Sequence, residues 1–153
     1  MARLPVSRHN LQKAFQKHKA CYEALKDTHN RSRRLILFYA VETGLKVYLL
    51  DKIQKHTSDD LFSHYDYKCL EKNGHDINIM LELAMLSGQF VLKTLRCKTG
   101  IQIAPSQYHQ LWRYGLELAD TADENEAETT LYNVVLHLSP IITEKKIMRS
   151  RAI

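Results

Sequence analysis

The sequence predicts an all-α protein built as an antiparallel bundle of four to five helices, with residues 1–153 forming a single domain. Apolar residues recur at helical spacing in five segments, and the connections between these segments are short. The chain has only five Gly and three Pro, which favours long helices over a turn-rich β fold. Residues 35–50 are apolar around most of a helical circumference, which is typical of a helix at the centre of a domain.

The first half of the chain is expected to hold two long helices and one short one. The expected elements are a helix over residues 8–27, a polar break over 28–30, a central helix over 31–55 and a short helix over 61–70 within a mixed segment. Asn73-Gly74 is a turn signal and is expected to end this part of the chain.

The second half is expected to hold three further helices and no strand. The expected elements are a helix from Gly74-His75-Asp76 to Leu95, a stop at Thr99-Gly100, a helix over 105–118 and a last helix from the capping box Thr121-Ala-Asp-Glu124. Asp76 or His75 would cap the first of these helices. We expect Pro140 to break or kink the last helix, which leaves a basic tail over residues 141–153.

Charge is distributed unevenly along the chain, whose net charge is +5. Residues 1–34 hold nine Lys or Arg and two acidic residues, whereas the segment 117–128 holds six acidic residues and no basic one. A basic surface of this kind binds phosphate groups of a nucleic acid, or it pairs with the acidic segment of the same chain or of a second subunit. Arg31, Arg33 and Arg34 oppose the dipole at the start of the central helix, so we expect them to hold an RNA backbone.

Glu42 is the most informative residue of the central helix because it lies in the apolar stripe of that helix. A buried carboxylate costs several kcal/mol unless it is paired or protonated. Lys46 follows four residues later, in the order that favours a Glu–Lys ion pair on a helix. Glu42 is therefore either half of a structural ion pair or a carboxylate that orients a partner group at a site.

Two histidines are the candidates for chemistry. His109 and Arg113 are four residues apart, so both project from one helix face. A titrating imidazole beside a fixed guanidinium suits phosphodiester chemistry, because histidine moves the proton and arginine stabilises charge on phosphoryl oxygens. His75 lies at a predicted helix start, where amide donors favour an anion. The alternatives are an Arg113 that pairs with Glu117, and a His75 that only caps its helix.

Other familiar sites are not indicated. The chain has no phosphate loop, GxGxxG, HExxH or nucleophile elbow, and its histidines and cysteines lack a metal-ligand spacing, so no metal and no cofactor are expected. Three widely spaced cysteines without a CxxC pair indicate reduced thiols in a cytoplasmic protein. No apolar stretch is long enough to span a membrane, and the N-terminus lacks the apolar core of a signal peptide, so no membrane partner is expected.

The segment Leu37-Phe-Tyr-Ala-Val-Glu-Thr-Gly-Leu-Lys46, followed about thirty residues later by Gly74-His75-Asp76, resembles the HEPN superfamily. These are helical domains of prokaryotic toxins, antiphage defence systems and nucleotide-handling enzymes, and the resemblance covers roughly residues 30–95. It implies a four- or five-helix bundle that dimerises, with a metal-independent endoribonuclease site across the interface. In active members an arginine precedes a histidine by four to six residues, whereas the late helices here hold His109 and Arg113 in reversed order.

Two hypotheses follow from the residues and the resemblance. In the first, the chain is an HEPN-like RNA-acting protein of a defence or toxin system, a homodimer that cleaves RNA by attack of a 2′-hydroxyl on the adjacent phosphate. His109 would be general base or acid, Arg113 would stabilise the phosphorane, His75 would assist, and Glu42 would orient one of these groups. In the second, the chain is a non-enzymatic HEPN-like subunit that binds RNA, a nucleotide or a larger protein partner and regulates it.

Overall fold

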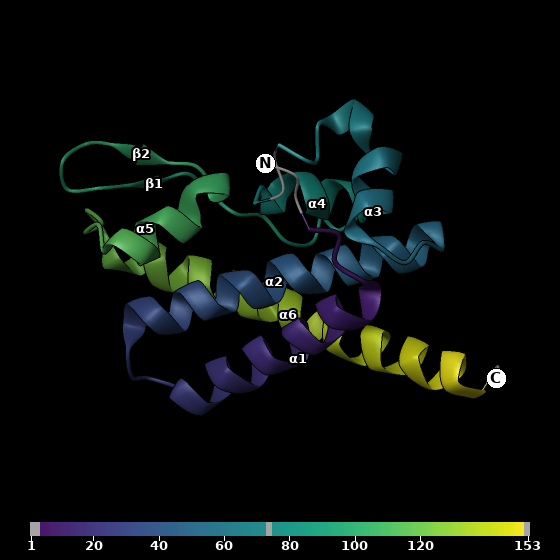
Figure 1. Cartoon of the computed structure of the whole chain (residues 1–153). Helices are drawn as coiled ribbons and strands as arrows, with labels where there is room; N and C mark the ends of the chain where they lie inside the picture. Colours follow the sequence, from purple (N-terminus) through teal and green to yellow (C-terminus); the bar gives the residue numbers. More distant parts are fainter. Residues whose placement is uncertain (1–3, 73–74, 152–153) are drawn as a thin grey trace.

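The computed structural model describes residues 4–72 and 75–151, with side chains described up to residue 143, and it is mostly helical (Figure 1). Its elements are α1 (Arg8–Leu25), α2 (Asn30–Ile53), α3 (Ser58–His64), the short 3₁₀ turn η1 (Asp66–Lys68), α4 (Ile77–Leu83), β1 (Leu95–Arg96), β2 (Gln102–Ile103), the 3₁₀ turn η2 (Pro105–Gln107), α5 (Tyr108–Tyr114) and α6 (Thr121–Arg151). The prediction of a mostly helical, all-α fold is confirmed for the described residues. They also contain one small two-stranded sheet, which was not predicted.

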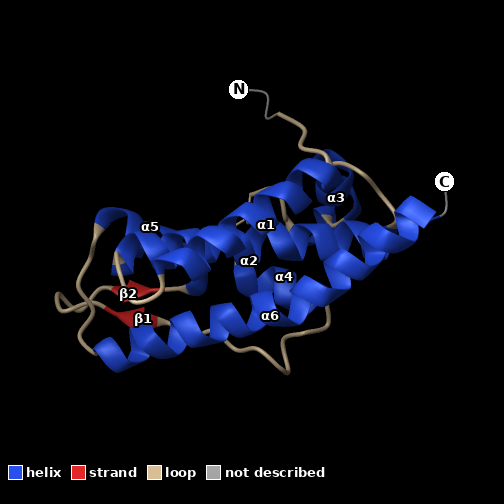
Figure 2. Ribbon diagram, turned by 90° about the horizontal axis from the view of Figure 1, so that it is seen from below, coloured by secondary structure: helices blue, strands red, loops and turns tan. Residues whose placement is uncertain are grey.

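The apolar segment of the sequence forms the central helix, α2, as predicted. This helix contacts α1, α3, α4, α5 and α6, and α1 and α6 run alongside it (Figures 1 and 2). Leu37, Phe38, Leu45 and Leu49 are completely buried in it. Each such side chain contributes about 1.5–3 kcal/mol of stabilising free energy when it leaves water. α2 therefore supplies much of the core, and the side chains of the neighbouring helices are positioned against it.

Gly44 lets three helices approach one another closely. A Cβ atom at this position would lie 2.8 Å from Cδ2 of Phe15 in α1 and 3.2 Å from Cδ1 of Leu138 in α6. The Phe15 ring is itself buried and has no room to retreat. The missing side chain therefore brings α1 and α6 onto neighbouring faces of α2, half a turn from Glu42.

The predicted third helix from His75 to Leu95 is wrong in its length. α4 begins after Asp76, whose carboxylate accepts from the amide of Ile79 at 3.3 Å, so this cap was predicted correctly. The helix ends after seven residues, and the chain then runs without helix into an antiparallel hairpin whose turn contains Thr99-Gly100. The prediction of no strand is wrong for the same region. Asn73 and Gly74 lie outside the described residues.

The last two helices begin close to the predicted positions. α5 covers only Tyr108–Tyr114 and ends at Gly115, whose φ of +68° is unfavourable for other residues. α6 begins at Thr121, but Asp120 supplies the carboxylate that accepts from the first turn, at the amide of Ala122. Pro140 lies inside α6 and does not end it. No helix in the described part of the chain combines the length and apolarity needed to cross a membrane.

Candidate functional site

Glu42 lies on the buried side of α2 and is held by two cationic or titrating groups. Its Oε1 atom accepts from Nζ of Lys46 at 2.9 Å and lies 3.1 Å from Nδ1 of His75. The ion pair predicted with Lys46 is therefore formed, and the carboxylate also contacts a candidate site residue. Burial acts to raise the pKa of Glu42, but the hydrogen bonds from His75 and Lys46 outweigh burial and lower it. Glu42 is therefore ionised at neutral pH.

His75 and His109 lie side by side, although 33 residues separate them in the sequence. Their ring centroids are 4.5 Å apart and their planes are tilted by 36°. His75 comes from the segment before α4, with 55% of its side chain exposed, whereas His109 is the second residue of α5 and is only 8% exposed. The His109 ring also contacts Phe38 of α2. We call Glu42, Lys46, His75 and His109 the Glu42 cluster.

His109 is set up to be neutral at physiological pH. Burial lowers the pKa of His109 most strongly, the charge of His75 adds to this, and the carboxylate of Glu42 opposes it. Its Nδ1 atom is buried and makes no hydrogen bond within the described part of the chain. The backbone of Ser106 also raises the pKa of His109, but this is the smallest of these effects. A neutral imidazole is able to accept a proton.

Arg113 lies one helical turn after His109 and reaches α2. Its Nη2 atom donates to the hydroxyl of Tyr39 at 2.8 Å, and its side chain is otherwise exposed. The predicted alternative, a pair between Arg113 and Glu117, is not formed, because Glu117 pairs with Lys98 at 3.1 Å. Tyr39 thus holds the guanidinium on the same side of α5 as His109.

Sequence reasoning missed Tyr39 and His18 as neighbours of this site. His18 of α1 is half-buried, with its ring centroid 6.0 Å from that of Tyr39. Burial lowers the pKa of His18, and the charge of Glu42 partly opposes this. Leu11, Phe15, His18 and Tyr22 recur at helical spacing, so the stripe of α1 that faces α2 was a signal that would have found it.

Arg33 and Arg34, predicted to hold RNA, are buried against acidic residues of the same chain. Nη2 of Arg33 lies 2.8 Å and Nε of Arg34 2.6 Å from Oε1 of Glu128 in α6. Tyr22 donates to the other oxygen of Glu128 at 2.7 Å, and Arg34 also pairs with Glu124. We call Glu128, Tyr22, Arg33 and Arg34 the Glu128 cluster. Pairing between the basic start and the acidic segment, an alternative left open by the sequence, thus accounts for these two arginines, whereas Arg31 remains exposed.

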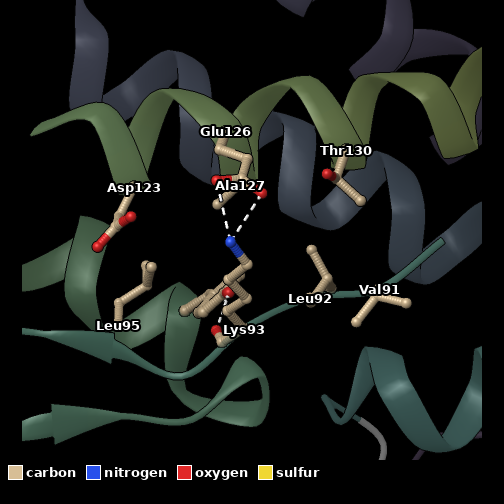
Figure 3. A pocket seen from close by; sticks show the side chains of 9 residues that line it. Val91, Leu92, Lys93, Leu95, Asp123, Glu126, Ala127 and Thr130 are labelled. Atoms are coloured by element: carbon tan, nitrogen blue, oxygen red, sulfur yellow. Dashed lines mark hydrogen bonds and ion pairs between the residues drawn. The ribbon is translucent and has the colours of Figure 1, made fainter.

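A small pocket beside α6 is not part of this site. Figure 3 shows Lys93 extending toward α6, where its ammonium lies 3.0 Å from Oε1 of Glu126. The hydroxyl of Tyr108 donates to the carbonyl of Lys93 behind this ion pair. The space left, about 10 Å³, holds at most one water molecule. This region is filled by side chains, whereas the Glu42 cluster holds one buried polar atom without a hydrogen-bond partner among the described residues, Nδ1 of His109.

The chain matches no protein-family model, no curated protein and no solved structure. Among the described residues, no group of three or more His, Cys, Asp or Glu side chains is arranged to hold a metal ion. The Glu42 cluster offers an ionised carboxylate, two adjacent imidazoles and, one turn away, a guanidinium.

Proposed function

We propose that this chain is an HEPN-like, metal-independent endoribonuclease of a defence or toxin system, in which His75 and His109 exchange protons with RNA. One observation supports this most: two imidazoles lie 4.5 Å apart, and one of them is held by the carboxylate of Glu42. General acid–base catalysis on a phosphodiester needs a proton acceptor and a proton donor that reach the same phosphate. An adjacent pair of imidazoles meets that requirement without further groups.

In the proposed mechanism, His109 is the base and His75 is the acid. Neutral His109 takes the proton of a ribose 2′-hydroxyl, whose oxygen attacks the adjacent phosphorus and forms a new P–O bond. The bond from phosphorus to the 5′ oxygen breaks, and His75 gives its proton to that oxygen. The products are a 2′,3′-cyclic phosphate and a 5′-hydroxyl end. Because the attacking group is the 2′-hydroxyl, DNA is not a substrate.

The other residues orient these groups or stabilise charge. Glu42 accepts from Nδ1 of His75, which fixes that ring and leaves Nε2 to carry the transferred proton. Arg113 follows His109 by one turn and would stabilise negative charge on the non-bridging oxygens of the phosphorane. Lys46 balances the charge of Glu42 from the side of Phe62, to which its ammonium lies 5.8 Å away.

Cleavage of a defined single-stranded RNA in the presence of a chelator tests the proposal. We expect fragments with 5′-hydroxyl ends, and a loss of at least about 10²-fold in rate for His75→Ala and for His109→Ala. His9→Ala is the matched control, because this histidine is exposed near the start of α1 and belongs to no described cluster. DNA of the same sequence should stay intact. Cleavage that survives both cluster substitutions would remove the assigned roles.

A second candidate, a non-enzymatic HEPN-like subunit that binds RNA or a larger protein partner, is favoured by two observations. His109 is only 8% exposed, and Arg33 and Arg34 are used within the chain. This candidate predicts that no RNA is cleaved under any condition. Both candidate functions are compatible with the homodimer that the resemblance implies. Light scattering of the purified protein measures the oligomeric state.

A further inference from the structure

One end of the molecule holds a polar groove of about 500 Å³ that the proposed chemistry does not use. The start of α2, the hairpin, the loop after α5 and the start of α6 line it. Arg34 and Glu124 in this lining pair with each other, which leaves Arg31, Lys98 and Glu117 as its other charged residues. Figure 1 shows the start of α2, the hairpin and α5 gathered at this end. We call this feature the Arg31 groove.

Arg31 lies at the edge of the groove, beside the loop after α5. Its guanidinium lies against the backbone of Gly115, where a Cβ atom would come within 2.2 Å of Nη1. The side chain is nevertheless exposed, unlike those of Arg33 and Arg34. A guanidinium that is positioned but open to solvent is suited to a phosphate, because its planar fork loses little freedom on binding.

Lys98 supplies a second cation to the groove. Its ammonium lies 3.1 Å from Oε2 of Glu117, and both side chains are 66% exposed. An exposed ion pair of this kind is worth little in water. A phosphate therefore displaces Glu117 from Lys98 at low cost, and the groove presents two cations to one anionic ligand.

The groove lies in line with the Glu42 cluster. α5 runs beside α2, and three contacts mark their register: His109 with Phe38, Arg113 with Tyr39, and Gly115 with Arg31. At 1.5 Å per residue, Arg31 lies roughly 16 Å from Glu42 along the axis of α2. Arg113 lies between these two points, on an exposed part of α5.

An aromatic side chain accompanies this row of cations. Tyr114 follows Arg113 and is 69% exposed. An exposed ring beside cations offers a base a stacking surface, and only an unpaired base presents its face to such a ring. These features favour a single strand over a duplex.

We propose that the Arg31 groove binds the backbone of a single-stranded RNA that extends along α5 from the Glu42 cluster. Arg31 and Lys98 contact a phosphate a few nucleotides from the cleaved bond. Tyr114 stacks on a base that lies between this phosphate and the cleaved bond. This inference rests on the proposed function for the direction of the strand. RNA binding is measured separately from RNA cleavage, so the groove proposal and the nuclease proposal can be contradicted independently of each other.

The experiment measures binding of a fluorescent, fully 2′-O-methylated single-stranded RNA to the full chain at several salt concentrations. This RNA lacks the attacking hydroxyl, so it is bound without being cut. Arg31→Gln should weaken binding about five- to tenfold and reduce the slope of log K against log salt by about 0.7, the value for one phosphate contact on a single strand. Lys98→Gln should act in the same direction but less, because Glu117 already neutralises part of the Lys98 charge in the free chain.

Lys93→Gln is the matched control. It removes the same charge from an exposed lysine that pairs with Glu126 outside the groove, so binding should not change. Tyr114→Ala should weaken binding of the single strand, and a duplex of the same length should compete poorly.

The groove proposal is overturned if Arg31→Gln binds with wild-type affinity and slope, or if the wild-type chain does not bind this RNA at low salt. A chain that cuts no RNA but binds it through Arg31 would overturn the proposed nuclease activity. The same result would support the groove as the RNA-binding surface of a non-enzymatic subunit. Equal weakening by Arg31→Gln and Lys93→Gln would show only general charge attraction and would also overturn the groove.

Discussion

Glu42 in α2 and Glu128 in α6 are two shielded carboxylates with different kinds of hydrogen-bond donors. Glu128 of α6 receives hydrogen bonds from Arg33, Arg34 and Tyr22, which bind α1, α2 and α6 together. Glu42 receives its hydrogen bonds from Lys46 and His75, and His75 in turn lies on His109. The pKa of Glu42 and that of Glu128 are both lowered by these bonds against the opposing effect of burial.

The difference between the two clusters is in the donors. Arginine stays charged at every physiological pH, and burial together with the hydrogen bond to Glu128 raises the pKa of Tyr22 far above its ordinary value. The Glu128 cluster therefore keeps one protonation state throughout the physiological pH range. The Glu42 cluster contains imidazoles, which change charge between about pH 5 and 8. A fixed network stabilises a fold, whereas a titrating network is able to exchange protons with a ligand.

The largest expected effect is on stability at the Glu128 cluster. Glu128→Gln removes the charge that two buried guanidinium groups share, and breaking a buried pair in this way costs about 3–5 kcal/mol. Urea denaturation at neutral pH measures the loss. Glu126→Gln, on the same helix but paired with exposed Lys93, is the control and should leave the midpoint unchanged. A loss no larger than that of the control would contradict the structural role of the cluster.

Glu42→Gln should cost less stability, about 1–3 kcal/mol, because solvent reaches His75 and the ammonium of Lys46 keeps its contact with Phe62. The same substitution should lower the rate of RNA cleavage by about 10–100-fold, since a residue that orients a catalytic group typically contributes that much. Glu128→Gln, assayed where it is still folded, should retain its cleavage rate. If Glu128→Gln lowers the cleavage rate as much as Glu42→Gln does, the two clusters do not differ in function as described.

Stability should fall with decreasing pH in two separate windows. The pKa values of His109 and His18 are lower in the folded protein than their ordinary 6.5, so the unfolded chain binds more protons just below pH 6.5 and stability begins to fall there. The pKa of Glu128 is lowered from 4.5, so its contribution is complete above pH 4.5 and is lost below it. Urea midpoints from pH 8 to pH 3 measure both windows. His109→Gln should weaken the first and Glu128→Gln the second; a single window unaffected by either variant would be inconsistent with these environments.

The sequence predicted the centre of the molecule well, because local signals and tertiary contacts agree there. The apolar run over 35–50 is buried by every neighbouring helix, and the Glu42–Lys46 pair follows from spacing along one helix. The Glu42–His75 contact links two parts of the chain that were singled out independently. Periodicity along the sequence could not predict that Glu42 and His75 lie close together in space.

The region after α4 was not predictable in the same way. Leu86, Phe90, Leu92 and Leu95 are all buried, but from a non-helical segment and a strand. Their spacing resembles a helix because a short irregular segment also turns apolar side chains toward a core. Likewise, the environment of Arg33 and Arg34 depends on α6 packing against α2, which no local pattern in either helix specifies.

The two adjacent imidazoles have different roles in the proposed mechanism, His109 as base and His75 as acid, and one measurement tests this assignment directly. An RNA in which sulfur replaces the 5′ oxygen at a single cleavage position has a leaving group that departs without being protonated. We predict that His75→Ala cleaves this RNA at close to the wild-type rate although it is at least about 10²-fold slower on ordinary RNA, and that His109→Ala is slow on both. Rescue of neither variant, or of both equally, would contradict the assignment of one imidazole as acid and the other as base.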